Sequence, residues 1–502
     1  MSKDVEMKEV ELNELDQEKQ PMTGDALAEK NGAVKVKVPE DPDVKFTGLS
    51  KDELMKVAGT AGWVRTRWVL LVLFWLGWLG MLAGAIVIII QAPRCKPLPE
   101  MNWWNEGPLY QIADVDAFTE DKGLEGVIEK LESLGQLKVK GLLLGPIHTV
   151  QKDQLNTLSL EKINAALGAP EVLDKLLDRA HKKSISIILD LTPNYEGDKP
   201  WFTRLVDLSD KLKAGIQHWM KKGVDGILLS SLDKTEMNPS EWVALLNAVH
   251  NSTEDGPKKR ALIGEMSASS ARKAVETLNS TGLDLLLSGV LKPNQTGQEK
   301  AGAVQQLYSS QPQTSLAWTL SGPRTGHLAS VVKPRSVRLY QLLLFTLPGT
   351  PVFNYGDELG LEDLRTTSPK MVWDIEDPAD EKNETAKALR AKMSSRRDWF
   401  RALSDLRGKE RSLAHGDYVH LHNATSSLAY VRIWDQSERY LTALNWGTAP
   451  VTLSLSHHDL PLQAKVRLST DPERHPQDQK VSLDSLELGP KEALLLSYPY
   501  TA

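Results

Sequence analysis

The feature that most constrains this chain is an uninterrupted apolar segment, residues 68–90, which contains 23 residues and no charged side chain. A helix rises about 1.5 Å per residue, so the segment is long enough to cross a hydrocarbon core of about 30 Å. It begins too far from Met1, and is too long, to be the apolar region of a cleavable signal peptide, which has about 7–15 residues. The sequence therefore predicts one membrane-spanning helix, which with its flank covers residues 63–91.

Flanking charges and glycosylation sequons predict the orientation of this helix. Four cationic residues lie before it and two after it: Lys51, Lys56, Arg65 and Arg67, then Arg94 and Lys96. An excess of Lys and Arg marks the cytoplasmic side. Every N-x-S/T sequon lies after the helix, at Asn251, Asn279, Asn294, Asn383 and Asn423. Because such sequons are glycosylated in the secretory pathway, a type II orientation is predicted, with a cytoplasmic N-terminus.

The segments on either side of the helix differ in character. Residues 1–62 are polar and almost free of aromatic side chains, so they cannot bury enough apolar surface to offset the entropy of ordering. A mostly disordered cytoplasmic tail is predicted there. Residues 92–103, which contain several prolines, are predicted to form a stalk after the helix. The net charge of −6, without a basic stripe, excludes nucleic acid as a partner. The sequence indicates neither a cofactor nor a metal.

Short apolar runs alternate with amphipathic stretches between residues 104 and 410. The runs predict strands at residues 109–112, 141–144, 185–191, 226–229, 261–263, 283–287, 316–319 and 351–354. The clearest amphipathic stretches predict helices at residues 123–134, 170–182, 208–222, 239–251 and 298–309. Eight strands alternating with helices over about 300 residues favour a (β/α)8 TIM barrel over an open sheet.

After residue 410 the period of the apolar pattern changes to two. Val451, Leu453 and Leu455 alternate with Thr452 and Ser454, and a similar alternation runs from residue 428 to 434. Such short runs, separated by turn residues, predict a small antiparallel β-sandwich domain at residues 411–502. The predicted fold class is therefore α/β: one transmembrane helix, a TIM-barrel ectodomain and a C-terminal β domain.

Several segments resemble the α-amylase superfamily of (β/α)8 glycosidases. They are GPLYQI (107–112), DLTPNY (190–195), GVDG (223–226), LPGTPVFNYGDELG (347–360) and SPKMVWD (368–374). The fourth is the most specific, and the resemblance runs from about residue 104 to the C-terminus. It implies the barrel fold. In an active member it also implies a carboxylate nucleophile and a carboxylic general acid on strand ends, about 5–5.5 Å apart.

The positions that this resemblance marks as catalytic have changed. Ser230 stands at the nucleophile position and Leu228 at that of the arginine that orients the nucleophile. Arg324 replaces a substrate-binding aspartate, and Tyr195 replaces a histidine. Glu265 alone matches the general acid, and an acid without a nucleophile does not cleave glycosides. The resemblance therefore implies a degenerate active site without a catalytic residue.

The remaining acidic residues of these motifs have a structural interpretation. Asp190 belongs to the degenerate site, and Asp225 lies in the GVDG segment. Both lie at strand ends or turns, as Glu265 does. Carboxylates in such places are expected to accept hydrogen bonds from the backbone or from cationic neighbours.

The length of the loop after the third strand indicates which branch of this superfamily the chain resembles. Only 27 residues separate Tyr195 from Gly223, too few for the domain B that active family members insert here. The layout resembles the heavy-chain subunits of the heteromeric amino-acid transporters, of the type that serves large neutral and cationic amino acids. That resemblance implies a subunit that pairs with a multi-spanning light chain, stabilises it and brings it to the plasma membrane.

Residues near the membrane offer contacts for such a partner. Cys95 is the sole cysteine, so it has no internal mate, and an intermolecular disulfide is favoured over an unreactive free thiol. The family resemblance implies the same bridge. Gly77, Gly80 and Gly84 mark one face of the helix, where small residues permit close packing of a partner helix in membrane lipid.

Two other functions stay open on the sequence alone. One is a stand-alone adhesion or sugar-binding receptor, and the other is an active α-glucosidase on the cell surface. An aspartate at position 230 would have favoured the enzyme, whereas Ser230 favours the subunit. Recovery of a multi-spanning protein with this chain under non-reducing conditions distinguishes the three.

Overall fold

The computed structural model describes residues 50–91, 95–195, 197, 199–202, 206–251, 259–267, 270–364, 368–373, 375 and 384–500. The chain forms two compact units, Met1–Pro93 and Arg94–Ala502. Most of the predicted cytoplasmic tail, the flanking Arg94 and the sequon asparagine Asn383 lie outside the described residues.

The described part of the first unit contains the helices α2 (Lys51–Ala58) and α3 (Ala61–Gln91). Helix α3 has 31 residues, and within the described part of the chain it is the one helix long and apolar enough to cross a membrane. The predicted apolar helix is thus confirmed. Gly77, Gly80 and Gly84 lie on it, and a Cβ added at any of the three would meet no atom within 4 Å.

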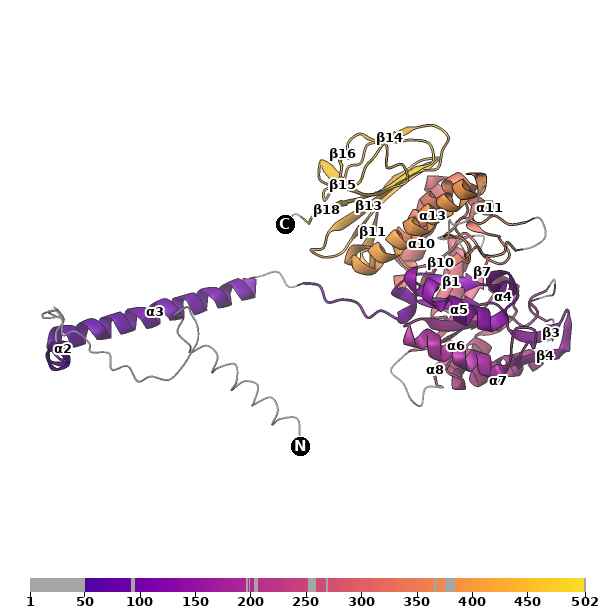
Figure 1. The fold of residues 1–502 in the computed structure, drawn as a ribbon, viewed down its shortest axis with the longest axis horizontal. Coiled ribbons are helices and arrows are strands. Elements are labelled where there is room, and N and C mark those ends of the chain that lie inside the picture. The colour runs from indigo at the N-terminus through magenta and orange to yellow at the C-terminus, as the bar shows by residue number, and fades with distance from the viewer. Residues whose placement is uncertain are drawn as a thin grey trace, which may run out of the picture. The chain divides into compact units, whose positions relative to one another are not determined.

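The second unit contains a closed barrel of parallel strands, which confirms the predicted TIM barrel (Figure 1). The strands are, in order around the barrel, β1 (Leu109–Ile112), β10 (Thr350–Asn354), β9 (Leu316–Trp318), β8 (Leu285–Ser288), β7 (Ala261–Met266), β6 (Gly226–Leu229), β5 (Ser186–Asp190) and β2 (Gly141–Leu144). Nearly all of their residues are buried. Both faces of the sheet are covered, which explains why these strands read as continuous apolar runs.

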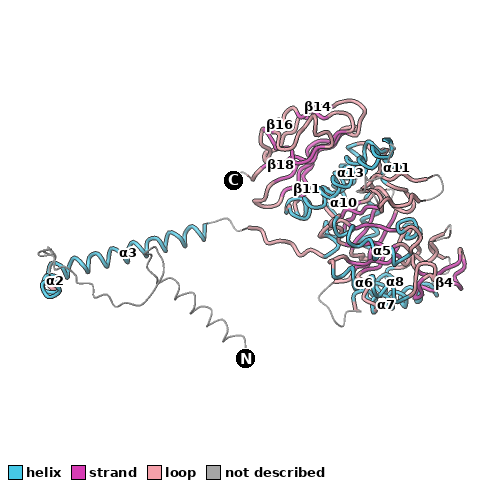
Figure 2. Tube along the Cα trace, in the orientation of Figure 1, coloured by secondary structure: helices cyan, strands magenta, loops and turns pink. Residues whose placement is uncertain are grey.

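Helices cover the outside of the barrel (Figure 2). They are α4 (Val115–Thr119), α5 (Gly123–Gln136), α6 (Pro170–Lys182), α7 (Val206–Lys221), α8 (Pro239–His250), α9 (Ala271–Thr281), α10 (Gly297–Ser310), α11 (Leu328–Val332), α12 (Val337–Thr346) and α13 (Glu384–Lys409). The short α14 (Arg411–His415) follows α13 and contacts the C-terminal domain. Local signals start several of them. Pro170 occupies the first turn of α6, and a capping box joins Thr296 to Glu299 at α10.

One hairpin beside the barrel was not predicted from the sequence. Strands β3 (His148–Gln151) and β4 (Gln154–Ile163) follow β2 and pair with each other in antiparallel fashion. Their burial depends on α7, whose Trp219 Nε1 donates to the Leu160 carbonyl at 2.7 Å. The hairpin is thus specified by a tertiary contact.

The C-terminal domain is antiparallel, as predicted. One sheet has the order β11 (Asp417–Asn423), β12 (Ser427–Ile433), β13 (Arg439–Asn445), β18 (Glu492–Tyr498), β15 (Gln463–Ser469) and β16 (Lys480–Ser482). The other is a two-stranded ribbon of β14 (Val451–Leu453) and β17 (Leu486–Leu488). Both sheets contribute to one buried core that includes Val431, Leu441, Leu453 and Leu488.

Two buried arginines bind the junction between the barrel and this domain. Arg432 of β12 donates to the carbonyls of Thr346, at 2.8 Å, and Gly416, at 2.7 Å. Arg407 of α13 donates to the Phe345 carbonyl at 2.5 Å. Burial lowers the pKa of Arg432 to about 10 and that of Arg407 to about 9, so both stay charged at neutral pH. Peptide carbonyls at the end of α12 thus take the place of carboxylate partners.

We expect Arg432→Met to lower the free energy of unfolding by about 3 kcal/mol, because it leaves the buried carbonyls of Thr346 and Gly416 without these donors. Thermal unfolding of the full-length protein in detergent, followed by circular dichroism, measures the change. Arg272→Met is the matched control, since Arg272 is exposed and pairs with Glu276 on the same helix. Equal loss of stability in the two variants would contradict the role given to Arg432.

Candidate functional site

The carboxyl ends of parallel barrel strands meet at one face, where barrel enzymes carry their active sites. Asp190 ends β5, Ser230 follows β6, and Glu265 lies near the end of β7. Arg324 comes from the loop after β9, and Tyr195 from the loop after β5. All five residues line one cavity of about 220 Å³, here called the strand-end cavity.

Ser230 sits between the two carboxylates of this cavity. Its Oγ lies 2.9 Å from Glu265 Oε2 and 3.2 Å from Asp190 Oδ2. Burial raises the pKa of both Asp190 and Glu265. A hydroxyl has one proton to donate, so it can satisfy only one ionised carboxylate at a time. Asp190 and Glu265 therefore compete for the single hydroxyl proton of Ser230.

Backbone contacts hold Ser230 and Asp190 in place. The amide of Ser230 donates to Thr192 Oγ1 at 2.9 Å, and the amide of Thr192 donates to Asp190 Oδ1 at 2.8 Å. Trp201 Nε1 donates to the Ser230 carbonyl at 3.1 Å. These contacts fix the backbone around Ser230 and the orientation of the Asp190 carboxylate.

The cation of the cavity comes from Arg324, whose Nη1 donates to the Ser231 hydroxyl. Its positive charge acts on both Asp190 and Glu265 and partly opposes the effect of their burial on the pKa. Leu228 of β6 is 1% exposed and packs in the apolar interior of the barrel. No guanidinium can therefore approach position 230 from β6.

Tyr195 belongs to the wall of the cavity. Its hydroxyl donates to the His148 carbonyl at 3.2 Å, and the two rings pack edge to face at 5.2 Å. Burial lowers the pKa of His148 to about 4, so this imidazole is neutral at pH 7. The Tyr195 contact ties the β3–β4 hairpin to the cavity, and the sequence analysis did not find it.

Asp225 lies at the opposite end of the barrel, before β6. Its Oδ2 accepts from the Ile187 amide at 2.8 Å and lies 2.7 Å from His181 Nε2. Gln111 of β1 was also missed by the sequence analysis, and it lines the strand-end cavity beside Glu265. Its place at the end of the GPLYQI motif was the available signal.

The other predicted residues lie on the surface of their units. Cys95 is a free, exposed cysteine. Asn251, Asn279 and Asn294 are exposed, whereas Asn423 at the end of β11 is partly buried. Asn279 Oδ1 accepts from Gln311 Nε2 at 2.7 Å.

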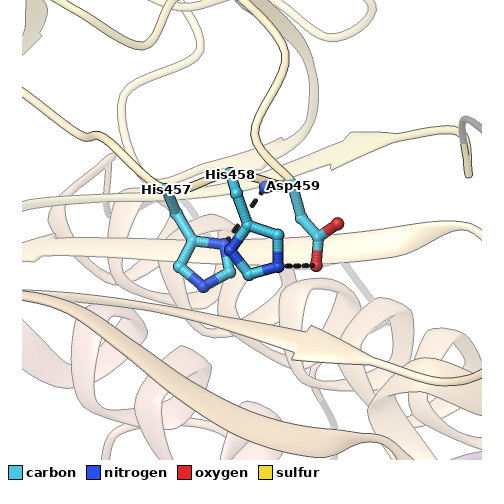
Figure 3. Close-up of side chains that lie close together, drawn as sticks. All are labelled: His457, His458 and Asp459. Carbon is cyan, nitrogen blue, oxygen red and sulfur yellow. Dashed lines mark hydrogen bonds and ion pairs between the residues drawn. The ribbon is translucent and has the colours of Figure 1, made fainter.

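Three consecutive residues after β14 offer atoms of the kinds that bind metals (Figure 3). His457, His458 and Asp459 bring one such atom each within 4.8 Å of the others. The His457 Nδ1 lone pair accepts from the Asp459 amide at 3.3 Å, and Asp459 Oδ1 lies 3.6 Å from Arg439. Local contacts account for this group, so we assign it no ligand.

Comparisons with known proteins agree with this architecture. A family model described as the N-terminus of solute carrier family 3 member 2 matches residues 34–110, and one described as the α-amylase catalytic domain matches residues 113–214. The structure of an α-amylase from Geobacillus thermoleovorans superposes with a TM-score of 0.63 at 18% identity, covering 80% of this chain and 100% of that one. That likeness shows the fold alone.

Full-length relatives are transporter subunits. The chain is 24% identical to the amino acid transporter heavy chain SLC3A1 of Rattus norvegicus, covering 97% of this chain and 91% of that one. It is 46% identical to the amino acid transporter heavy chain SLC3A2 of Mus musculus, covering 100% of both chains. At this identity over the whole length, the chain belongs to the family of SLC3A2 amino acid transporter heavy chains.

Proposed function

We propose that this chain is a non-catalytic type II membrane glycoprotein that pairs with a multi-spanning amino-acid transporter light chain, stabilises it and brings it to the plasma membrane. The full-length likeness to proteins named amino acid transporter heavy chains carries the proposal. Among the described residues α3 is the one helix that could span a membrane, and this supports the proposal because one helix cannot enclose a substrate path.

The strand-end cavity supports the non-catalytic part of the proposal. Retaining glycosidases need an ionised nucleophile beside the general acid. Here the residue beside Glu265 is Ser230, whose hydroxyl is hydrogen-bonded to carboxylates on both sides. A neutral serine hydroxyl has no negative charge to stabilise an oxocarbenium-like transition state, and the position of the orienting arginine is taken by the buried Leu228.

Two contacts suggest how a partner is held. Cys95 is an exposed free cysteine in the segment before the barrel. The next residue, Lys96, is anchored to the C-terminal domain: its amide donates to Asp435 Oδ2 at 3.0 Å, and its Nζ lies 4.9 Å from the Trp434 ring centre. This anchor presents the exposed thiol of Cys95 at a defined place on the ectodomain.

We expect purified full-length protein to release no 4-nitrophenol from 4-nitrophenyl α-glucoside. Loss of a nucleophile typically lowers kcat by a factor on the order of 10⁴ or more. Ser230→Asp should not restore activity, because it adds a third carboxylate beside Asp190 and Glu265 while Leu228 and Arg324 remain. Turnover by the wild type that disappears in a Glu265→Gln variant would show that the barrel is an enzyme.

We expect Cys95→Ser to abolish a covalent complex with the light chain but to leave part of the association, because packing of α3 and ectodomain contacts remain. Non-reducing gels of wild type should show a heavier band that is absent in the variant, and mild-detergent co-purification should still recover the partner. Lys96→Ala is the matched control: it keeps both the thiol and the backbone amide that donates to Asp435, so its band should persist. A wild type that runs as a monomer without reductant contradicts the bridge.

We expect deletion of the ectodomain, with residues 1–100 kept, to lower the amount of light chain at the cell surface. A single helix offers little contact, whereas a folded domain can add an interface of about 1,200–2,000 Å². Surface biotinylation alongside amino-acid uptake measures the effect, and uptake per surface molecule should change less than surface amount. Normal surface amount with lost uptake would instead assign the barrel a direct part in transport.

A further inference from the structure

A second cavity of about 350 Å³ adjoins the strand-end cavity, and Glu265 lines both. Its walls combine apolar side chains, among them Leu287, Leu291 and Leu320, with the hydroxyls of Ser267, Thr319 and Thr325. Ser267 and Thr325 are exposed at its rim. The cavity therefore opens at the same end of the barrel as the strand-end cavity and beside it.

Asn294 lies on the rim of this second cavity and is exposed. It begins the sequon Asn294-Gln295-Thr296. Asn279 and Asn423, which begin two other sequons, lie on α9 and β11 and are not among the lining residues of this cavity. An N-linked glycan on Asn294 would thus start at the cavity mouth.

The loop that carries Asn294 is held from several sides. The buried Lys300 donates from Nζ to the Gln295 carbonyl at 2.6 Å, and the Tyr340 hydroxyl donates to the Pro293 carbonyl at 3.1 Å. Gln295 Nε2 donates to the Val290 carbonyl at 2.8 Å. Because both neighbours of Asn294 are fixed, the first sugar of a glycan would leave the backbone at a defined position.

The lining matches the chemistry of a sugar. Pyranose rings have apolar faces that pack on aliphatic side chains and hydroxyls that exchange hydrogen bonds with polar rims. The second cavity offers both, through the leucines of its wall and the hydroxyls of Ser267, Thr319 and Thr325. The glycan's own inner residues are the sugars held closest to it, at the high effective concentration that a short covalent link provides.

We propose that the glycan on Asn294 covers the mouth of the second cavity, beside the strand-end cavity. This inference rests on the proposed extracellular placement of the barrel, since only then does Asn294 receive a glycan. The chain's own sugar would exclude free saccharides from the end of the barrel where glycosidases bind them.

Cysteine labelling tests this proposal, because Cys95 is the only native thiol. In a Cys95→Ser background, Thr325→Cys places a thiol at the rim of the second cavity, and Ser454→Cys places an exposed reference thiol in the C-terminal domain. The full-length proteins are expressed in mammalian cells, and the rate of modification by a bulky maleimide-polyethylene glycol is read as a gel shift.

We expect Asn294→Gln to remove one glycan and to speed labelling of the Thr325→Cys thiol several-fold, because the cover is gone. Labelling of the Ser454→Cys thiol should not change. Asn279→Gln is the matched control, since it removes a glycan from α9 and should leave the Thr325→Cys rate unaltered. Enzymatic removal of glycans from the folded protein should reproduce the increase without any substitution at Asn294.

Three results overturn the inference. The first is an Asn294→Gln variant that loses a glycan yet labels at the parental rate. The second is unchanged mobility of Asn294→Gln while Asn279→Gln or Asn423→Gln loses a glycan, which leaves the proposed orientation intact. The third is unchanged mobility of every sequon variant, which refutes the extracellular placement as well.

Discussion

Closure of the barrel between β1 and β10 is the constraint on which the rest of the ectodomain depends. Leu109 lies opposite Val352 and Tyr110 opposite Phe353 in this parallel pairing. Once the strands are closed in parallel, their carboxyl ends share one face, and their inward side chains form one apolar layer. Because Cys95 is the sole cysteine, no disulfide within the chain can stabilise the barrel. Its stability must come from this apolar packing and from the helices that cover the strands.

The same closure brings polar residues from different strands together at one end of the barrel. Asp190 and Glu265 are buried carboxyls that share the hydroxyl of Ser230. Arg324 supplies a positive charge from a neighbouring loop, and Leu228 has joined the apolar interior. The side chains of Asp190, Ser230 and Glu265 are therefore hydrogen-bonded to one another within this cavity.

The C-terminal domain links the barrel to the membrane-proximal stalk. Arg432 and Arg407 bind carbonyls at the end of α12, so the β domain and the barrel are joined through buried charged hydrogen bonds. On the same β domain, Asp435 accepts from the amide of Lys96, next to the thiol of Cys95. These contacts fix the segment that carries Cys95 against the C-terminal domain.

Local sequence patterns determined the elements of this protein but not the contacts between them. Helix α6 was predicted at its observed bounds, and all eight barrel strands were predicted within a few residues of theirs. The spacing of apolar residues, and the Pro or Gly residues that flank an element, are signals contained within that element. The motif resemblance also named Asp190, Ser230 and Glu265 as neighbours. Tertiary structure alone decided that Ser230 bridges two carboxyls, that Lys96 docks on Asp435 and that β3–β4 folds against α7. These contacts join residues 35, 339 and 59 positions apart, and no local periodicity records such pairings.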